Sequence, residues 1–118
     1  MEEKTTVLVK LPGQPLAYMN VPTTHIRDVH QSIPGFQSSE VDIFSLYRGF
    51  YYIIMDKDRV KKRLPANMTA YLVDTAGRTN VVDVQGTFAI CKLPHGLTGP
   101  MGSMTPQDTQ EVIKLLQK

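Results

Sequence analysis

The apolar pattern of this chain is densest at residues 41–56, which read VDIFSLYRGFYYIIMD. β-Branched and aromatic residues dominate this run, as they do in pleated, half-buried strands. Arg48-Gly49 interrupts the run at a point where glycine can take the positive φ of a tight turn. The pattern therefore predicts a β-hairpin. The successive apolar residues Ile53, Ile54 and Met55 indicate a strand that is covered on both faces or bulged, so we expect the hairpin in the middle of a sheet.

Four shorter runs predict further strands. Residues 5–10 (TTVLVK) stop at a segment with two prolines and a glycine, and residues 16–21 (LAYMNV) can return as a hairpin partner. Residues 69–73 (TAYLV) form another short strand, and residues 81–91 (VVDVQGTFAIC) form the last one after a stretch of turn composition. Gly86 in this last strand is expected to mark a bulge or a close backbone approach.

Two segments have helical spacing. Residues 25–33 carry apolar side chains at helical intervals, follow a Thr-Thr pair that can cap exposed amides, and precede Pro-Gly, so they predict a short helix. Thr105, Pro106 and Asp108 are the residue types of a capped helix start, with proline first and a carboxylate in the first turn. This second helix is expected over residues 105–117, and its predicted apolar face consists of Val112, Ile113, Leu115 and Leu116.

These elements predict an α+β fold with a mainly antiparallel sheet, one short internal helix and one C-terminal helix. The length of 118 residues suits a single domain over residues 1–118 with one core. Residues 93–104 contain three glycines and two prolines, and we expect them to form a mobile loop between the last strand and the C-terminal helix.

Composition places the chain among ordinary globular proteins. It is 42% apolar and 20% charged, and no run approaches the roughly 18 apolar residues of a membrane span. The acidic start lacks the basic and apolar segments of a secretory signal. The single cysteine, Cys91, cannot form an internal disulfide, which fits a reducing compartment. We therefore expect a cytoplasmic protein that does not contact a membrane.

No residue set for catalysis is visible in the sequence. His25 and His30 are five residues apart and fall on different faces of the expected helix, so they cannot chelate one metal as a helical pair. Cys91 has no His or Asp at a recognisable spacing and is interpreted as a buried, inert thiol. Gly-x-Ser-x-Gly and the glycine-rich phosphate loops are absent. The sequence predicts a non-enzymatic protein with no metal site and no cofactor.

The distribution of charge gives the strongest functional indication. The net charge of +2 is too small to indicate a general nucleic-acid binder, but residues 57–63 (KDRVKKR) place five cations against one aspartate. Cations beside an aromatic-rich sheet can bind phosphates while the aromatic rings stack on bases. The alternative is a solvated turn in which the charges of the acids and the cations neutralise one another. His95 is included as a candidate because residues 93–104 would bring it to a bound anion if they act as a lid. The candidate ligand-binding residues are Arg48, Tyr51, Arg59, Lys61, Lys62, Arg63, Asn67, Tyr71, Arg78 and His95.

Four motifs, in their order and spacing, resemble a known family. They are Pro12-Gly13 after the first strand, Ile33-Pro34-Gly35-Phe36, Leu64-Pro65-x-Asn67, and Asp83-x-x-Gly86-Thr87-Phe88-Ala89-Ile90. Together they resemble a small domain of unknown function found in bacteriophages and mobile elements, over about residues 6–116. This chain departs from the family in having Pro34 where a second glycine is expected and in a longer loop at residues 93–104. The resemblance implies an accessory protein in the cytoplasm of a bacterial host, a setting in which small proteins often counter host defence.

The resulting hypothesis is an anti-defence protein that sequesters an anionic, nucleotide-type ligand, with cations on its phosphates and aromatic rings on its base. We expect a homo-oligomer because a short sheet with two small helices can leave an edge or a face uncovered. Two alternatives stay open. One is an inhibitor that docks a strand edge, or the loop carrying Met101 and Met104, onto a host protein. The other is a weak binder of single-stranded nucleic acid.

Overall fold

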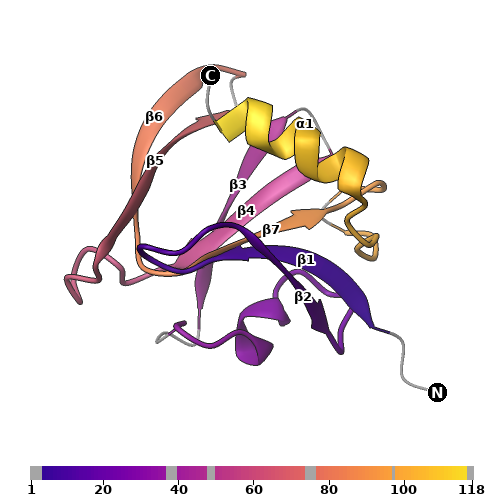
Figure 1. Ribbon diagram of the computed structural model, residues 1–118, viewed down its shortest axis with the longest axis horizontal. Coiled ribbons are helices and arrows are strands. Elements are labelled where there is room, and N and C mark those ends of the chain that lie inside the picture. The colour runs from indigo at the N-terminus through magenta and orange to yellow at the C-terminus, as the bar shows by residue number, and fades with distance from the viewer. Residues whose placement is uncertain (1–3, 37–39, 48–49, 74–76, 97, 117–118) are drawn as a thin grey trace.

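Seven strands form an antiparallel sheet in the computed structural model, which describes residues 4–36, 40–47, 50–73, 77–96 and 98–116. The neighbour order is β2-β1-β7-β4-β3-β5-β6 (Figure 1). The strands are β1 (Thr5–Lys10), β2 (Ala17–Val21), β3 (Val41–Tyr47), β4 (Tyr51–Asp56), β5 (Ala66–Val73), β6 (Thr79–Gln85) and β7 (Phe88–Lys92). Two helical elements accompany them, the 3-10 helix η1 (Val29–Ser32) and the α-helix α1 (Pro106–Leu116). The predicted antiparallel sheet with a C-terminal helix is confirmed.

The predicted central hairpin consists of β3 and β4. These strands pair antiparallel, with Phe44 opposite Ile53 and Val41 opposite Asp56, and they lie in the middle of the strand order. The register shifts once, between Ser45 and Tyr47. The predicted turn at Arg48-Gly49 lies outside the described residues.

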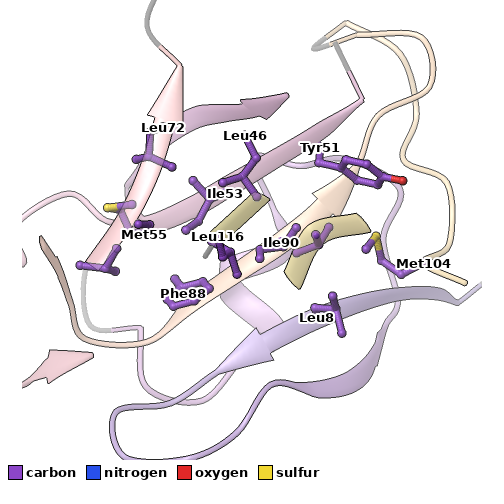
Figure 2. Packing of buried hydrophobic residues seen from close by; sticks show 13 residues of the cluster. Leu8, Leu46, Tyr51, Ile53, Met55, Leu72, Phe88, Ile90, Met104 and Leu116 are labelled. Atoms are coloured by element: carbon purple, nitrogen blue, oxygen red, sulfur yellow. The ribbon is translucent and has the colours of Figure 1, made fainter. Parts of the chain in front are cut away.

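The central strands β4 and β7 are buried on both faces, as the run of apolar residues in β4 predicts. Ile53 and Met55 face α1 and pack in one cluster with residues such as Phe88 (Figure 2). Ile54 faces the opposite side and packs in a second cluster. Ile26, from the segment that leads into η1, belongs to this second cluster. In Figure 1, α1 lies across one face of the sheet and the η1 segment lies against the other. The sheet therefore has a hydrophobic layer on each side.

The predicted strand over residues 81–91 is instead two strands, and this expectation was wrong. β6 pairs with β5 at one margin of the sheet, whereas β7 lies between β1 and β4. The chain changes direction at Gly86, which has a φ of +80° and donates its N–H to the carbonyl of Pro65 at 2.7 Å. A Cβ at Gly86 would lie 2.7 Å from Leu64 Cδ1, so the expected close approach is confirmed but the bulge is not.

The predicted internal helix at residues 25–33 is confirmed only in part, as a 3-10 helix shorter than expected. Only η1 is helical, and the segment is held by turns in which Asp28 donates to His25, Gln31 to Asp28 and Ile33 to His30 at 3.0–3.2 Å. Asp28 occupies the N-cap of η1 without a side-chain capping bond. The segment is short, rich in β-branched residues and followed by proline, so successive 3-10 turns bury its apolar side chains without a regular α-helix.

The helix α1 begins as its sequence predicts. Asp108 N–H donates to Thr105 Oγ1 at 3.1 Å, and Thr105 N–H donates to Asp108 Oδ2 at 2.9 Å, which together make a reciprocal capping box. Val112 and Leu116 are buried against the sheet, but the predicted apolar face is narrower than expected because Ile113 is 36% exposed.

The glycine-rich segment before α1 follows the sheet closely where it is described. Leu93, Met101 and Met104 are buried. Met101 N–H donates to the carbonyl of Thr24 at 2.8 Å, and Met104 N–H donates to that of Thr6 at 2.9 Å. Within the described ranges, no helix is both long and apolar enough to cross a membrane.

Candidate functional site

Residues 57–63, here called the basic turn, connect β4 to β5 at one end of the sheet and carry five cations. The turn is held by its own backbone: Lys62 N–H donates to the carbonyl of Asp58 at 2.8 Å, and Leu64 N–H donates to that of Arg59 at 3.0 Å. The side chain of Leu64 is buried and anchors the end of the turn. The basic turn is thus a compact structure with a defined shape.

Lys57 and Arg59 each pair with an acidic side chain. Arg59 Nη1 donates to Asp42 Oδ2 at 2.7 Å and to the carbonyl of Asp56 at 3.0 Å, and its guanidinium lies over the ring of Phe44 at 5.9 Å. Lys57 Nζ lies 2.9 Å from Glu40 Oε2, and this hydrogen bond raises the pKa of Lys57. Arg59 therefore stabilises the turn through largely buried contacts, whereas the Lys57–Glu40 pair is exposed to solvent and contributes little to stability.

Lys61, Lys62 and Arg63, at the end of the turn, are all exposed. Arg63 has a φ of 52° and is the non-glycine residue with positive φ among those described. This conformation costs an L-residue roughly 1–2 kcal/mol relative to ordinary helical backbone. The fold therefore holds Arg63 in a conformation that other residue types, such as glycine, would adopt at lower cost.

Lys10 and Asn67 lie at the same end of the sheet. Asn67 Nδ2 donates to the carbonyls of Lys10 and Gly86 at 2.9 Å each, and Lys10 Nζ donates to Asn67 Oδ1 at 2.5 Å. Asn67 thus ties β1, β5 and the β6–β7 corner together, and this use of its amide is structural. Sequence reasoning missed Lys10, because its position beside Asn67 depends on the pairing of distant strands.

Tyr51 lies at the opposite end of the sheet from the basic turn. It begins β4 and the turn follows the end of that strand, so about 17 Å of extended chain separates them. Its hydroxyl donates to Asp108 Oδ1 at 2.6 Å, and burial, followed by this bond, raises its pKa well above the ordinary value. In Figure 2 Tyr51 lies at the margin of the core cluster with its hydroxyl directed outward. Tyr51 is buried and cannot stack on a base bound at the basic turn.

The buried carboxylate of Asp108 is the centre of a polar network at that opposite end. Its Oδ2 also accepts hydrogen bonds from Lys92 Nζ at 3.0 Å and from Thr105 Oγ1 at 2.9 Å. Burial alone would raise the pKa of Asp108, but the hydrogen bonds from Tyr51, Thr105 and Lys92 outweigh it and lower the pKa to about 2. Asp108 is therefore ionised at neutral pH and fixes the start of α1 on the sheet.

The other predicted ligand residues are dispersed. Tyr71 is half-buried on β5, on the face opposite to Ala70 and Leu72. Arg78 is exposed just before β6, and His95 is exposed beside Gly99 after β7. Arg48 lies outside the described residues. The structure thus brings Arg59, Lys61, Lys62, Arg63 and Asn67 to one end of the sheet and does not bring the predicted aromatic residues to them.

Two surface hollows meet at Arg27, a residue that the sequence analysis did not single out. One, of about 410 Å³, is lined by His25, Ile26, Arg27, Asp28, Thr98 and Gly99. The other, of about 360 Å³, is lined by Arg27, His30, Glu40, Val41 and Lys57, so it adjoins the basic turn. The sequence does not reveal that Arg27 and Lys57 line one hollow, because they are distant along the chain.

The described residues do not form a recognisable catalytic arrangement. Cys91 is fully buried, and burial raises its thiol pKa to about 12, so it stays protonated and inaccessible to substrate. In the part of the chain that the structure describes, no three His, Cys, Asp or Glu side chains gather as metal ligands would.

Comparison of the chain with models of protein families, with curated proteins and with solved structures gives no match.

Proposed function

We propose that this protein binds a phosphate-bearing ligand at the basic turn and sequesters it without catalysis. The observation that carries the proposal is the pair of exposed cations Lys61 and Arg63 on a turn whose backbone is held by its own hydrogen bonds. Lys57 and Arg59 pair with Glu40 and Asp42, whereas Lys61 and Arg63 occupy exposed positions of the same turn. Preorganised donors of this kind bind phosphate oxygens through charge-assisted hydrogen bonds at low ordering cost.

The ligand class follows from what lies near the turn. The two tyrosines that were expected to stack on a base do not lie at the basic turn. Tyr51 is buried at the other end of β4, and Tyr71 is half-buried on β5. Recognition therefore rests on phosphates more than on the base. The hollow between Arg27 and Lys57 adjoins the turn and provides room for the remainder of a nucleotide-type ligand. The resemblance to a phage and mobile-element domain supports a nucleotide-type defence signal as that ligand.

The test is calorimetric titration of the purified protein with inorganic tripolyphosphate and with ATP. If phosphates carry the binding, the two dissociation constants should agree within about tenfold, since a base contact would otherwise add a favourable term. Binding should also raise the thermal midpoint, because ligand at about a thousand times its dissociation constant adds roughly 4 kcal/mol to the free energy of unfolding.

Two variants assign the site. Arg63→Gly removes the guanidinium and suits the positive φ, and Lys61→Ser removes an exposed ammonium. Each should weaken binding roughly 10- to 100-fold, the effect of one charge-assisted hydrogen bond of about 1.5–3 kcal/mol. Lys114→Ser, an exposed cation on α1, is the matched control and should bind as the wild type does. Unchanged affinity in both turn variants, or no binding of either phosphate compound, would contradict the proposal.

A further inference from the structure

The outer edge of β6 has no strand beside it in the described part of the chain. β6 is the last strand of the sheet order and pairs only with β5 among the described residues. It is seven residues long, and Figure 1 shows it as the outermost ribbon on the left of the sheet. Its sequence, TNVVDVQ, contains no proline, lysine or arginine, which are the residues that usually prevent edge strands from pairing with another chain.

The other edge strand is protected. β2 is five residues long and lies between Pro15 and Pro22, neither of which can donate a backbone hydrogen bond. Its Tyr18 hydroxyl is also engaged with Thr109 Oγ1 of α1 at 2.6 Å. The two edges therefore differ: Pro22 directly follows β2 and Pro15 lies two positions before it, whereas β6 contains no proline.

We infer that β6 pairs antiparallel with β6 of a second copy of this chain, about a two-fold axis through Val81. Val81 is 62% exposed although it lies in the middle of a strand, and it would meet its own copy across the axis. In the same register Thr79 of one copy faces Asp83 of the other. The structure already contains this type of pair within one chain, because Thr69 Oγ1 donates to Asp83 Oδ1 at 2.9 Å across β5 and β6. The single charge of the strand thus faces a hydroxyl and not its own copy.

The pairing continues the side-chain rows of the existing sheet. Tyr71 lies opposite Val81 in the β5–β6 register, so the joined sheets would carry the row Tyr71, Val81, Val81, Tyr71 on their outer face. Aromatic and β-branched neighbours stabilise cross-strand pairs. Because β2 is protected at the far edge, pairing at β6 ends with two copies and does not propagate into a fibre. Each dimer would present two basic turns.

The experiment measures molar mass by sedimentation equilibrium of the whole chain from about 1 µM to about 500 µM, a range suited to interfaces smaller than standard size. The wild type should shift from monomer to dimer within this range. Val81→Lys places a charge opposite its own copy and should leave the protein monomeric throughout, with an unchanged far-UV spectrum because the side chain is exposed. Ala17→Lys, an exposed position on β2, is the matched control and should dimerise as the wild type does.

A covalent measurement checks the register. Val81→Cys should form a disulfide-linked dimer under mild oxidation, whereas the wild type and Ala17→Cys should not, because Cys91 is buried. A wild type that stays monomeric over the whole range would overturn the proposal and leave the β6 edge to a strand of another protein. Dimerisation that Val81→Lys leaves intact would overturn it as well.

Discussion

The Tyr51 hydroxyl donates a 2.6 Å hydrogen bond to Asp108 Oδ1 and thereby joins the start of β4 to the first turn of α1. The same carboxylate accepts from Lys92 on β7 and from Thr105 at the helix cap. One buried ionised group therefore links two central strands to the helix that covers them. These bonds hold the start of α1 on the sheet although the preceding segment is rich in glycine.

Removal of the hydroxyl in Tyr51→Phe should lower the free energy of unfolding by about 1–2 kcal/mol, because a buried carboxylate oxygen loses its donor. Urea denaturation should show a lower midpoint with an unchanged slope. Tyr18→Phe is the control: the Tyr18 hydroxyl makes a bond of the same length to Thr109, but Tyr18 is exposed and water can replace the bond. Equal losses in the two variants would contradict a special role for Asp108.

The Asp108 network should make stability sensitive to acid. The pKa of Asp108 falls from 3.8 to about 2 on folding, so the folded protein binds this proton less tightly than the unfolded chain. The stabilisation is complete above pH 3.8 and is lost as the pH falls through about 2. Thermal midpoints of the wild type and Asp108→Asn should therefore differ by a constant amount near neutrality and converge between those two pH values. A difference that persists undiminished at the lower pH would show that charge is not the origin of the effect.

The features that sequence reasoning recovered have local signals. The hairpin of β3 and β4 follows from a run of β-branched and aromatic residues, and burial of Ile53 and Ile54 on opposite faces follows from the absence of alternation. The start of α1 follows from Thr105, Pro106 and Asp108, because cap and first turn lie within four residues. Such contacts do not depend on how distant strands pair.

The features that it missed depend on contacts distant in sequence. The composition of residues 81–91 is uniformly strand-like. The division into β6 and β7 occurs at Gly86, which packs against Leu64 in the connection between β4 and β5. The candidate site was likewise recovered only in part. The basic turn is continuous in sequence, but its surroundings follow from the tertiary structure. These are the ion pair of Arg59 with Asp42, the hydrogen bond of Lys10 to Asn67, and the hollow that Arg27 and Lys57 line together.

Substitution at Gly86 should reveal this corner. Gly86→Ala should lower the free energy of unfolding by about 2–4 kcal/mol, since it combines a strained positive φ with a Cβ 2.7 Å from Leu64 Cδ1. Gly13→Ala has a similar φ, +76° against +80°, but nothing lies within 4 Å of the added Cβ. It should therefore cost only about 1 kcal/mol. Chemical denaturation of both variants separates strain from overpacking, and equal costs would show that Leu64 moves aside easily.

Cys91 should react with a thiol reagent only when the protein opens. It is completely buried and burial raises its pKa to about 12, so the native protein presents neither access nor thiolate. Labelling by an aromatic disulfide at pH 8 should be slow in buffer and fast in denaturing urea, and its rate should follow the fraction of unfolded protein. Rapid stoichiometric labelling under native conditions would show that β7 opens locally.

Arg59 and Lys61, only two positions apart, should behave in opposite ways. Arg59→Ala removes the ion pair with Asp42 and the packing on Phe44, so it should lower the free energy of unfolding by about 1–2 kcal/mol. Lys61→Ala should change it by less than about 0.5 kcal/mol, because an exposed side chain outside such contacts contributes little. Affinity for tripolyphosphate should show the reverse order in the folded protein, with the larger loss at Lys61. If Lys61→Ala destabilised the fold as much as Arg59→Ala, the division of the turn into structural and ligand-binding cations would be wrong.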